Sequence, residues 1–205
     1  MAVGSVQLAF AQAAAEDGIV LEPGSFDWLC EQGHVGLERV AKARRDPALV
    51  APVSAAIALL GAIHSRLGGD VSVLHASREN LLLPIELLHA ASGTVIELDD
   101  SPHFTSARLA ALELYPDDAA VAFAVGEHKQ LCRKWSTRTD GLARGLPAKG
   151  FGFGGAARER AYHDALVDLA TPAMGQPPVV RVVELGGDGA AAYRRERDAL
   201  VRLLG

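Results

Sequence analysis

Two acidic residues two positions apart, Glu97 and Asp99, are the residues of this 205-residue chain best suited to chemistry. They lie in the run T-V-I-E-L-D-D-S-P-H-F, residues 94–104. Because side chains alternate along a strand, such an E-x-D pair lies on one face, where two carboxylates can share a cation. Mg²⁺ prefers oxygen ligands, so the pair and one further oxygen donor predict a site for Mg²⁺ or Mn²⁺. His103, four residues after Asp99, is placed to transfer a proton or contact a phosphate.

This run resembles the strand-and-turn motif of the PD-(D/E)XK nuclease superfamily, in the branch that includes very-short-patch-repair-like endonucleases. The motif there reads V-E-x-D-G-x-Q-H, and the resemblance covers residues 68–125. It implies that Glu97 and Asp99 hold the metal and that an earlier acid on the preceding strand completes its shell. The matching position is Asn80, where the family shows Asp. Asn80 offers a neutral carbonyl ligand, and Glu79 or Glu86 can supply the missing charge after a shift of register.

The turn after the strand also differs from the family pattern. Asp100 and Pro102 stand where the family has glycine and glutamine, and no lysine follows Glu97 by two. The predicted function is a nuclease-like protein that uses Mg²⁺ to hydrolyse phosphodiester bonds, with Arg78 and Arg108 neutralising the developing charge. The alternative is a catalytically inactive module on the same fold that binds nucleic acid or protein. A third hypothesis is a structural or oligomeric accessory protein that binds no nucleic acid.

Charge is segregated along the chain. The total is −5, but residues 129–160 hold eight lysines and arginines against two acidic residues, a balance of +6 that leaves −11 elsewhere. A phosphate-facing strip has this composition, and Trp135, Phe151 and Phe153 could stack on unpaired bases; a solvated helix face and loop is the alternative. Nucleic acid is therefore the expected partner, with DNA favoured. The cations expected to contact it are Arg78, Arg108, Lys129, Arg133, Lys134, Arg138 and Lys149.

Other patterns in the sequence predict less. The glycine-rich run 150–155 lacks G-K-[S/T] and a preceding strand, which favours a flexible connection over a phosphate-binding loop. Cys30 and Cys132 match no metal or disulfide spacing, which favours a reducing, cytoplasmic location. The apolar runs are interrupted before they reach the length of a membrane span, so no membrane partner is expected.

The elements that must position the E-x-D pair follow from hydrophobic periodicity. Helical spacing predicts a helical N-terminal region over 1–67, and a change of texture predicts a PD-(D/E)XK-like core over 68–205. Strands are expected at 71–74, 81–83, 94–98, 121–125 and 179–185, and helices from 101 or 105 to 115 and at 127–135, 156–170 and 188–204. The alternation predicts an α/β fold, with α+β as the other possibility, built on a small mixed central sheet flanked by helices.

Overall fold

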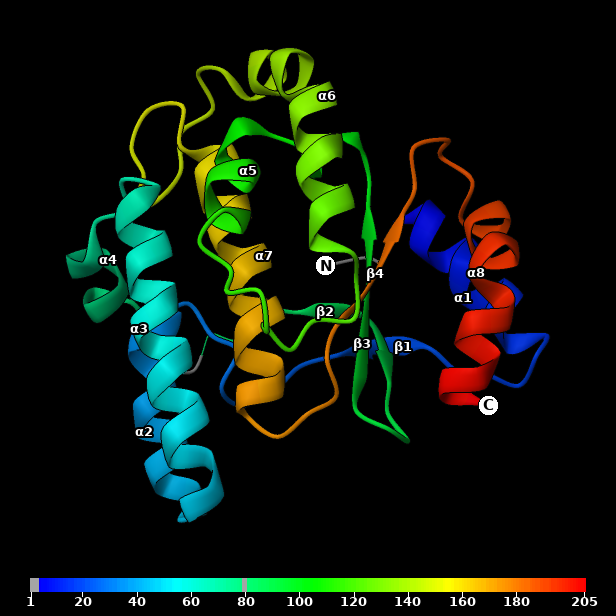
Figure 1. Ribbon diagram of the computed structural model, residues 1–205, viewed down its shortest axis with the longest axis horizontal. Helices are drawn as coiled ribbons and strands as arrows, with labels where there is room; N and C mark the ends of the chain where they lie inside the picture. The colour runs from blue at the N-terminus through cyan, green and yellow to red at the C-terminus, as the bar shows by residue number, and fades with distance from the viewer. Residues whose placement is uncertain (1–3, 79–80) are drawn as a thin grey trace.

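One four-stranded mixed sheet forms the centre of the computed structural model, which describes residues 4–78 and 81–205 (Figure 1). In order across the sheet, its strands are β1 (Glu22–Gly24), β2 (Ile85–His89), β3 (Thr94–Asp99) and β4 (Val180–Val183). β2 is antiparallel to β1 and to β3, whereas β3 and β4 are parallel. The predicted small mixed sheet is therefore confirmed. The parallel pair brings the carboxyl ends of β3 and β4 to the same edge of the sheet.

Helices cover both faces of this sheet (Figure 1). They are α1 (Ser5–Ala15), α2 (His34–Arg44), η1 (Pro47–Leu49), α3 (Val50–Arg66), α4 (Val71–Ala76), η2 (Ser101–His103), α5 (Ser106–Leu112), α6 (Val125–Ala143), α7 (Ala156–Ala173) and α8 (Gly189–Leu204). α1 and α8 pack together on one face, where Ile96 and Leu98 of β3 join their core. Val95 points to the opposite face and joins the larger core formed with α2, α3, α5 and α7. The alternation of β3 therefore turns Glu97 and Asp99 toward the larger group of helices.

The described part of the predicted N-terminal region, residues 4–67, contributes to the same layers as the rest of the described chain. β1 pairs with β2, and Cys30 forms an isolated bridge with Leu82. α1 packs against α8 at the other end of the sequence. The boundary at residue 67 stays a prediction.

Three predicted strands differ in the structure. Residues 71–74 belong to helix α4, because the Asp70 carboxylate caps it by accepting hydrogen bonds from the Ser72 backbone N–H at 2.9 Å and hydroxyl at 2.6 Å. Residues 81–83 give only the bridge at Leu82, and β2 begins at Ile85, just after Pro84, which lacks an N–H donor. Residues 121–124 alternate in burial like a strand but pair with no strand in the described part of the chain, and Val125 begins α6; the centroid of the Phe123 ring lies 4.5 Å from that of the His128 ring.

Helix α6 is longer than the predicted helix at 127–135 and takes up part of the predicted connection at 136–155. Its second half contains weak helix formers such as Thr139 and Gly141. The Thr139 hydroxyl donates to the carbonyl oxygen of Phe104 at 2.8 Å and is buried. This tertiary contact with the segment before α5 outweighs the local propensity.

The stretch Pro47–Arg66, which joins η1 and α3, is long and apolar enough to cross a membrane by length and composition. In the fold it packs against α2 and α7, with Val53, Leu60 and Ile63 buried. Core helices of soluble proteins pass the same test, so the cytoplasmic location stays a prediction.

Candidate functional site

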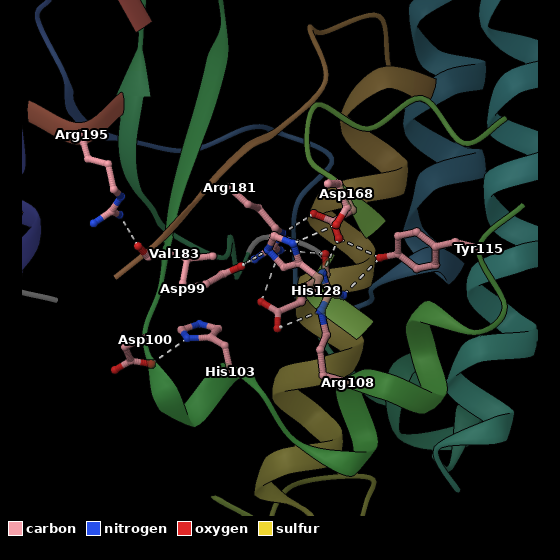
Figure 2. Close-up of polar contacts among 12 residues, drawn as sticks. Asp99, Asp100, His103, Arg108, Tyr115, His128, Asp168, Arg181, Val183 and Arg195 are labelled. Carbon is pink, nitrogen blue, oxygen red and sulfur yellow. Dashed lines mark hydrogen bonds and ion pairs between the residues drawn. The ribbon is translucent and has the colours of Figure 1, made fainter. Parts of the chain in front are cut away.

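The two acids of the E-x-D pair have different surroundings. Asp99 is 1% exposed, and both of its carboxylate oxygens are bound by side chains (Figure 2). Oδ1 accepts from Nη1 of Arg181 at 2.6 Å, and Oδ2 lies 3.1 Å from Nε2 of His128. Glu97 is only partly buried and stands beside Arg181 in the parallel register of β3 and β4. Asp99 is therefore a paired structural acid, whereas Glu97 keeps contact with solvent.

Asp99 belongs to a larger set of buried charges, which we call the buried ion cluster. Its members are Asp99, Arg108, Asp164, Asp168 and Arg181. Arg181 Nε donates to Asp168 Oδ1 at 2.7 Å, and Arg181 Nη2 lies 3.4 Å from Asp164 Oδ1. Arg108 Nη2 donates to Asp168 Oδ2 at 2.7 Å, and its Nε lies 3.9 Å from Asp164 Oδ2. Two guanidiniums therefore bind three carboxylates in the interior.

Tyr115 and His128 complete the hydrogen bonds around the cluster. The Tyr115 hydroxyl donates to Asp168 Oδ2 at 2.7 Å and accepts from Arg108 Nη1 at 3.2 Å. His128 bridges Asp99 and the carbonyl oxygen of Ala124, which lies 3.3 Å from its Nδ1. Buried charges persist when they are paired and hydrogen-bonded, and Asp99 and Asp168 meet that condition, whereas Asp164 Oδ2 is buried without a hydrogen bond and has only the Arg108 guanidinium 3.9 Å away.

Separate elements carry the members of the cluster to one place. Asp164 and Asp168 are four residues apart, so they lie on one face of α7. Arg108 lies in the first turn of α5, where the Thr105 hydroxyl caps the helix by accepting from the Arg108 N–H at 3.0 Å. Arg181 is the second residue of β4. The cluster thus fastens β3, β4, α5 and α7 together, and His128 adds α6.

Charge and burial shift the pKa values of the two acids of the E-x-D pair in opposite directions. Burial alone would raise the pKa of Asp99, but the charge of Arg181 and the hydrogen bond to His128 outweigh it and hold that pKa well below its usual range. At Glu97, burial raises the pKa to about 7, against a smaller opposing effect of Arg181. Glu97 therefore exchanges its proton near neutral pH, which suits proton transfer.

His103 lies on η2, just after β3, and is paired with Asp100 at 2.7 Å from its Nδ1 (Figure 2). Burial disfavours its charged form, but the hydrogen bond to Asp100 and the charges of Asp164 and Asp99 outweigh this and raise the pKa of His103. The charge of Asp99 thus acts on His103, while the role of His103 in proton transfer or phosphate contact stays a prediction.

The other predicted site residues are dispersed. Arg108, expected to contact nucleic acid, is instead 2% exposed and bound within the cluster. Arg78 is exposed beyond α4, and Glu86 is exposed on β2. Lys149 lies 3.8 Å from Glu31 and donates to the Ser77 hydroxyl. The remaining four cations, Lys129, Arg133, Lys134 and Arg138, all lie on α6. Glu79 and Asn80 lie outside the described residues.

The described residues do not fit a Mg²⁺ site. Across 4–78 and 81–205, no group of three or more His, Cys, Asp or Glu side chains is arranged to hold a metal ion. Both oxygens of Asp99 are bound by Arg181 and His128, so a cation at the E-x-D pair would have to break buried ion pairs. The guanidinium of Arg181 supplies the positive charge at this position.

The predicted site residues do not include three members of the cluster, Asp164, Asp168 and Arg181. The sequence contains a signal for each. Arg181 interrupts the apolar run V-V-R-V-V, and an arginine inside a buried strand requires an acidic partner. Asp164 and Asp168 share the buried side of α7, which the spacing of Tyr162, Leu166 and Leu169 identifies only as a packing face.

Comparisons with protein-family models, with curated proteins and with solved structures find no match to this chain. The resemblance to PD-(D/E)XK nucleases therefore remains a prediction.

Proposed function

We propose that this chain binds nucleic acid without cleaving it. The observation that carries the proposal is the α6 basic face, formed by Lys129, Arg133, Lys134 and Arg138. Arg133, Lys134 and Arg138 are exposed and Lys129 is half-buried. Among the described residues, no carboxylate forms an ion pair with any of the four.

The α6 basic face has the dimensions of a phosphate contact. Lys129 and Arg133 lie one turn apart on one side of α6, and Lys134 and Arg138 lie one turn apart about 140° further round, so the four cover its solvent-facing half over about 14 Å. Double-stranded DNA presents about eight phosphate charges over that length. The opposite side of α6, with His128, Cys132 and Thr139, is buried. The helix is therefore fixed by its apolar side and by the bond from His128 to Asp99, while its cations face solvent.

The absence of cleavage in this proposal rests on Asp99. Its carboxylate is neutralised by Arg181 and held by His128, so the E-x-D pair offers Glu97 as its one partly exposed acid. Burial also raises the pKa of the Cys132 thiol to about 11, which keeps it protonated at neutral pH and unsuited to nucleophilic attack.

The test measures binding to labelled 20-mers of single- and double-stranded DNA and of RNA by fluorescence anisotropy over a KCl series. Two double variants remove the same charge from exposed helix positions: Arg133→Gln/Lys134→Gln on α6, and the control Arg194→Gln/Arg202→Gln on α8. Each phosphate contact contributes about one to the slope of log K against log salt. The α6 variant should lower that slope by about two and the affinity at 100 mM KCl about tenfold, whereas the control should retain both.

Three outcomes would overturn the proposal. The first is no binding to any of these nucleic acids at 50 mM KCl, which would favour the accessory-protein hypothesis. The second is an equal loss in the α6 variant and the α8 control, which would exclude the α6 basic face. The third is cleavage of the labelled DNA in 5 mM MgCl₂ that disappears in EDTA and in Asp99→Asn, which would establish the nuclease.

A further inference from the structure

An apolar hollow of about 210 Å³ lies where the C-terminal end of α6 meets η2 and the first turn of α7. Its lining includes Pro102 of η2, Leu142 and Ala143 of α6, Leu146 in the loop that follows α6, and Ala157 and Arg160 of α7. We call it the α6–α7 hollow. Its volume equals that of about seven liquid waters, which is enough for a single planar base. Pro102 belongs to the turn that follows the E-x-D pair, so the hollow is next to the candidate site.

Large apolar side chains are exposed around this hollow. Leu142 is 65% exposed, Leu146 is 54% exposed and Phe153 is 81% exposed, the highest value among the exposed large hydrophobic residues of the described chain. The tip of the Phe153 ring lies 3.5 Å from the position that a Cβ on Gly145 would occupy, so the ring lies against the turn between the lining residues Ala143 and Leu146. Large apolar side chains that gather in an exposed region of a protein are typical of a binding site.

Phe153 is presented by a loop that is hydrogen-bonded internally. Nη2 of Arg158 donates to the carbonyl oxygens of Phe151 at 2.6 Å and Phe153 at 3.2 Å. The Phe151 ring is buried, and its centroid lies 5.2 Å from that of the His64 ring. This contact anchors the loop in the larger core. The glycines on either side of Phe153 have φ of 68° and 67°, a conformation that favours glycine. The exposed position of Phe153 is thus determined by the loop.

Exposed cations lie around the hollow. Arg160 lines it, Arg144 is exposed at the end of α6, and Arg138 of the α6 basic face precedes Thr139, another lining residue. The Asp140 carboxylate is engaged by the Ser106 N–H at 3.0 Å. An apolar hollow with a cationic rim is complementary to a base that carries its own phosphate.

We propose that the α6–α7 hollow holds one unpaired base of the bound nucleic acid, with Phe153 stacking on that base or its neighbour and Arg160 contacting the phosphate. This inference rests on the proposed function and specifies its substrate as single-stranded. Thr139, the hydroxyl-bearing residue of the hollow, already donates to Phe104. The base is therefore held by stacking and burial, without preference for one base over another.

The test compares one 20-mer as a single strand and as a fully paired duplex by anisotropy. Removing an aromatic platform weakens single-strand binding about tenfold, so Phe153→Ala should lose about tenfold on the single strand and less than twofold on the duplex, and Phe153→Trp should restore binding. Ala157→Leu fills the hollow and should act like Phe153→Ala. Its control is Ala190→Leu, because Ala190 is also the second residue of a helix and equally half-buried.

Each result separates this inference from the proposed function. If neither the single strand nor the duplex binds, the proposed function fails. If both bind and Phe153→Ala changes neither, or changes both equally, the inference alone fails. A concentration-dependent dimer mass that Phe153→Ala abolishes would assign the hollow to a second copy of the chain and overturn the inference. Phe153→Ala alters an exposed side chain, so it stays informative even if Ala157→Leu does not fold.

Discussion

Two tyrosines donate to an aspartate over the same distance but in different surroundings, which gives a matched test of the buried ion cluster. The Tyr115 hydroxyl donates to Asp168 Oδ2 at 2.7 Å in the interior. The Tyr193 hydroxyl donates to Asp17 Oδ2 at 2.7 Å; Tyr193 is also buried, but the Asp17 carboxylate keeps contact with solvent and is bound by Arg197 as well. Replacement by phenylalanine removes a single oxygen atom in each case.

The expected loss of stability differs between the two variants. A buried hydrogen bond to a charged group contributes about 2 kcal/mol. Tyr115→Phe also leaves Nη1 of Arg108 without its 3.2 Å acceptor, which adds about 1 kcal/mol. Tyr193→Phe should cost at most about 1 kcal/mol, since Asp17 keeps Arg197 and solvent. An unfolding entropy of about 0.43 kcal/mol/K for a chain of this length converts these losses to about 7 °C and 2 °C in Tm.

Urea unfolding followed by circular dichroism measures both losses. The slope of the free energy of unfolding against urea concentration should be the same in the wild type and the two variants, because the surface exposed on unfolding changes little. A loss below 1 kcal/mol for Tyr115→Phe, or equal losses in the two variants, would refute the assignment of Asp168 to a buried network that depends on every donor.

Three further predictions concern other parts of the structure. Arg181→Met leaves buried carboxylates unpaired and should cost about 4 kcal/mol in urea unfolding, whereas the exposed Arg202→Met should cost less than 1 kcal/mol. Thr105→Ala removes the cap of α5 and should cost about 1 kcal/mol, and Thr105→Ser should restore most of it; equal losses in both variants would contradict the capping role. Burial, with a smaller contribution from the charge of His64, lowers the pKa of His34 to about 4, so between pH 6.5 and 4 the unfolded chain binds a proton that the folded chain does not. The free energy of unfolding should therefore fall as the pH falls through that window, by up to about 3 kcal/mol from this group. Between pH 7 and 4.5, the free energy of unfolding of His34→Gln should fall less than that of the wild type.

The sequence predicts well those elements whose signals are local. Helix α7 begins at the predicted residue 156, and β3 extends the predicted strand 94–98 by one residue. Helix α8 begins where Asp188 predicts, and the Asp188 carboxylate accepts a hydrogen bond from the Ala191 N–H at 2.9 Å. In each case a hydrophobic period and a capping or terminating residue lie within a few positions of one another, so no tertiary information is needed.

The partners of the E-x-D pair could not be predicted in this way. Asp99 binds Arg181, 82 residues away, and His128, 29 residues away. The spacing of Glu97 and Asp99 indicates that both lie on one face, but it does not indicate whether a metal ion or a guanidinium faces them. That choice depends on the register of β4 against β3, which places Arg181 beside Glu97. The hydrophobic periodicity of one segment does not determine how that segment pairs with a distant strand, so it cannot predict this register.

The consequence of this register extends from the sheet to the surface. Because Asp99 is bound by Arg181 on one side and His128 on the other, the same carboxylate fastens β4 and α6 to β3. Replacing Arg181 by a cation from solvent would require breaking its bonds to Asp99 and Asp168, each in the interior, and breaking buried pairs costs several kcal/mol. The Asp99 carboxylate is thus not open to a cation from solvent, and it instead attaches α6 to β3 through His128. A helix whose backbone is held in place loses less backbone freedom when it meets a phosphate backbone, which is what the proposed binding by the α6 basic face requires.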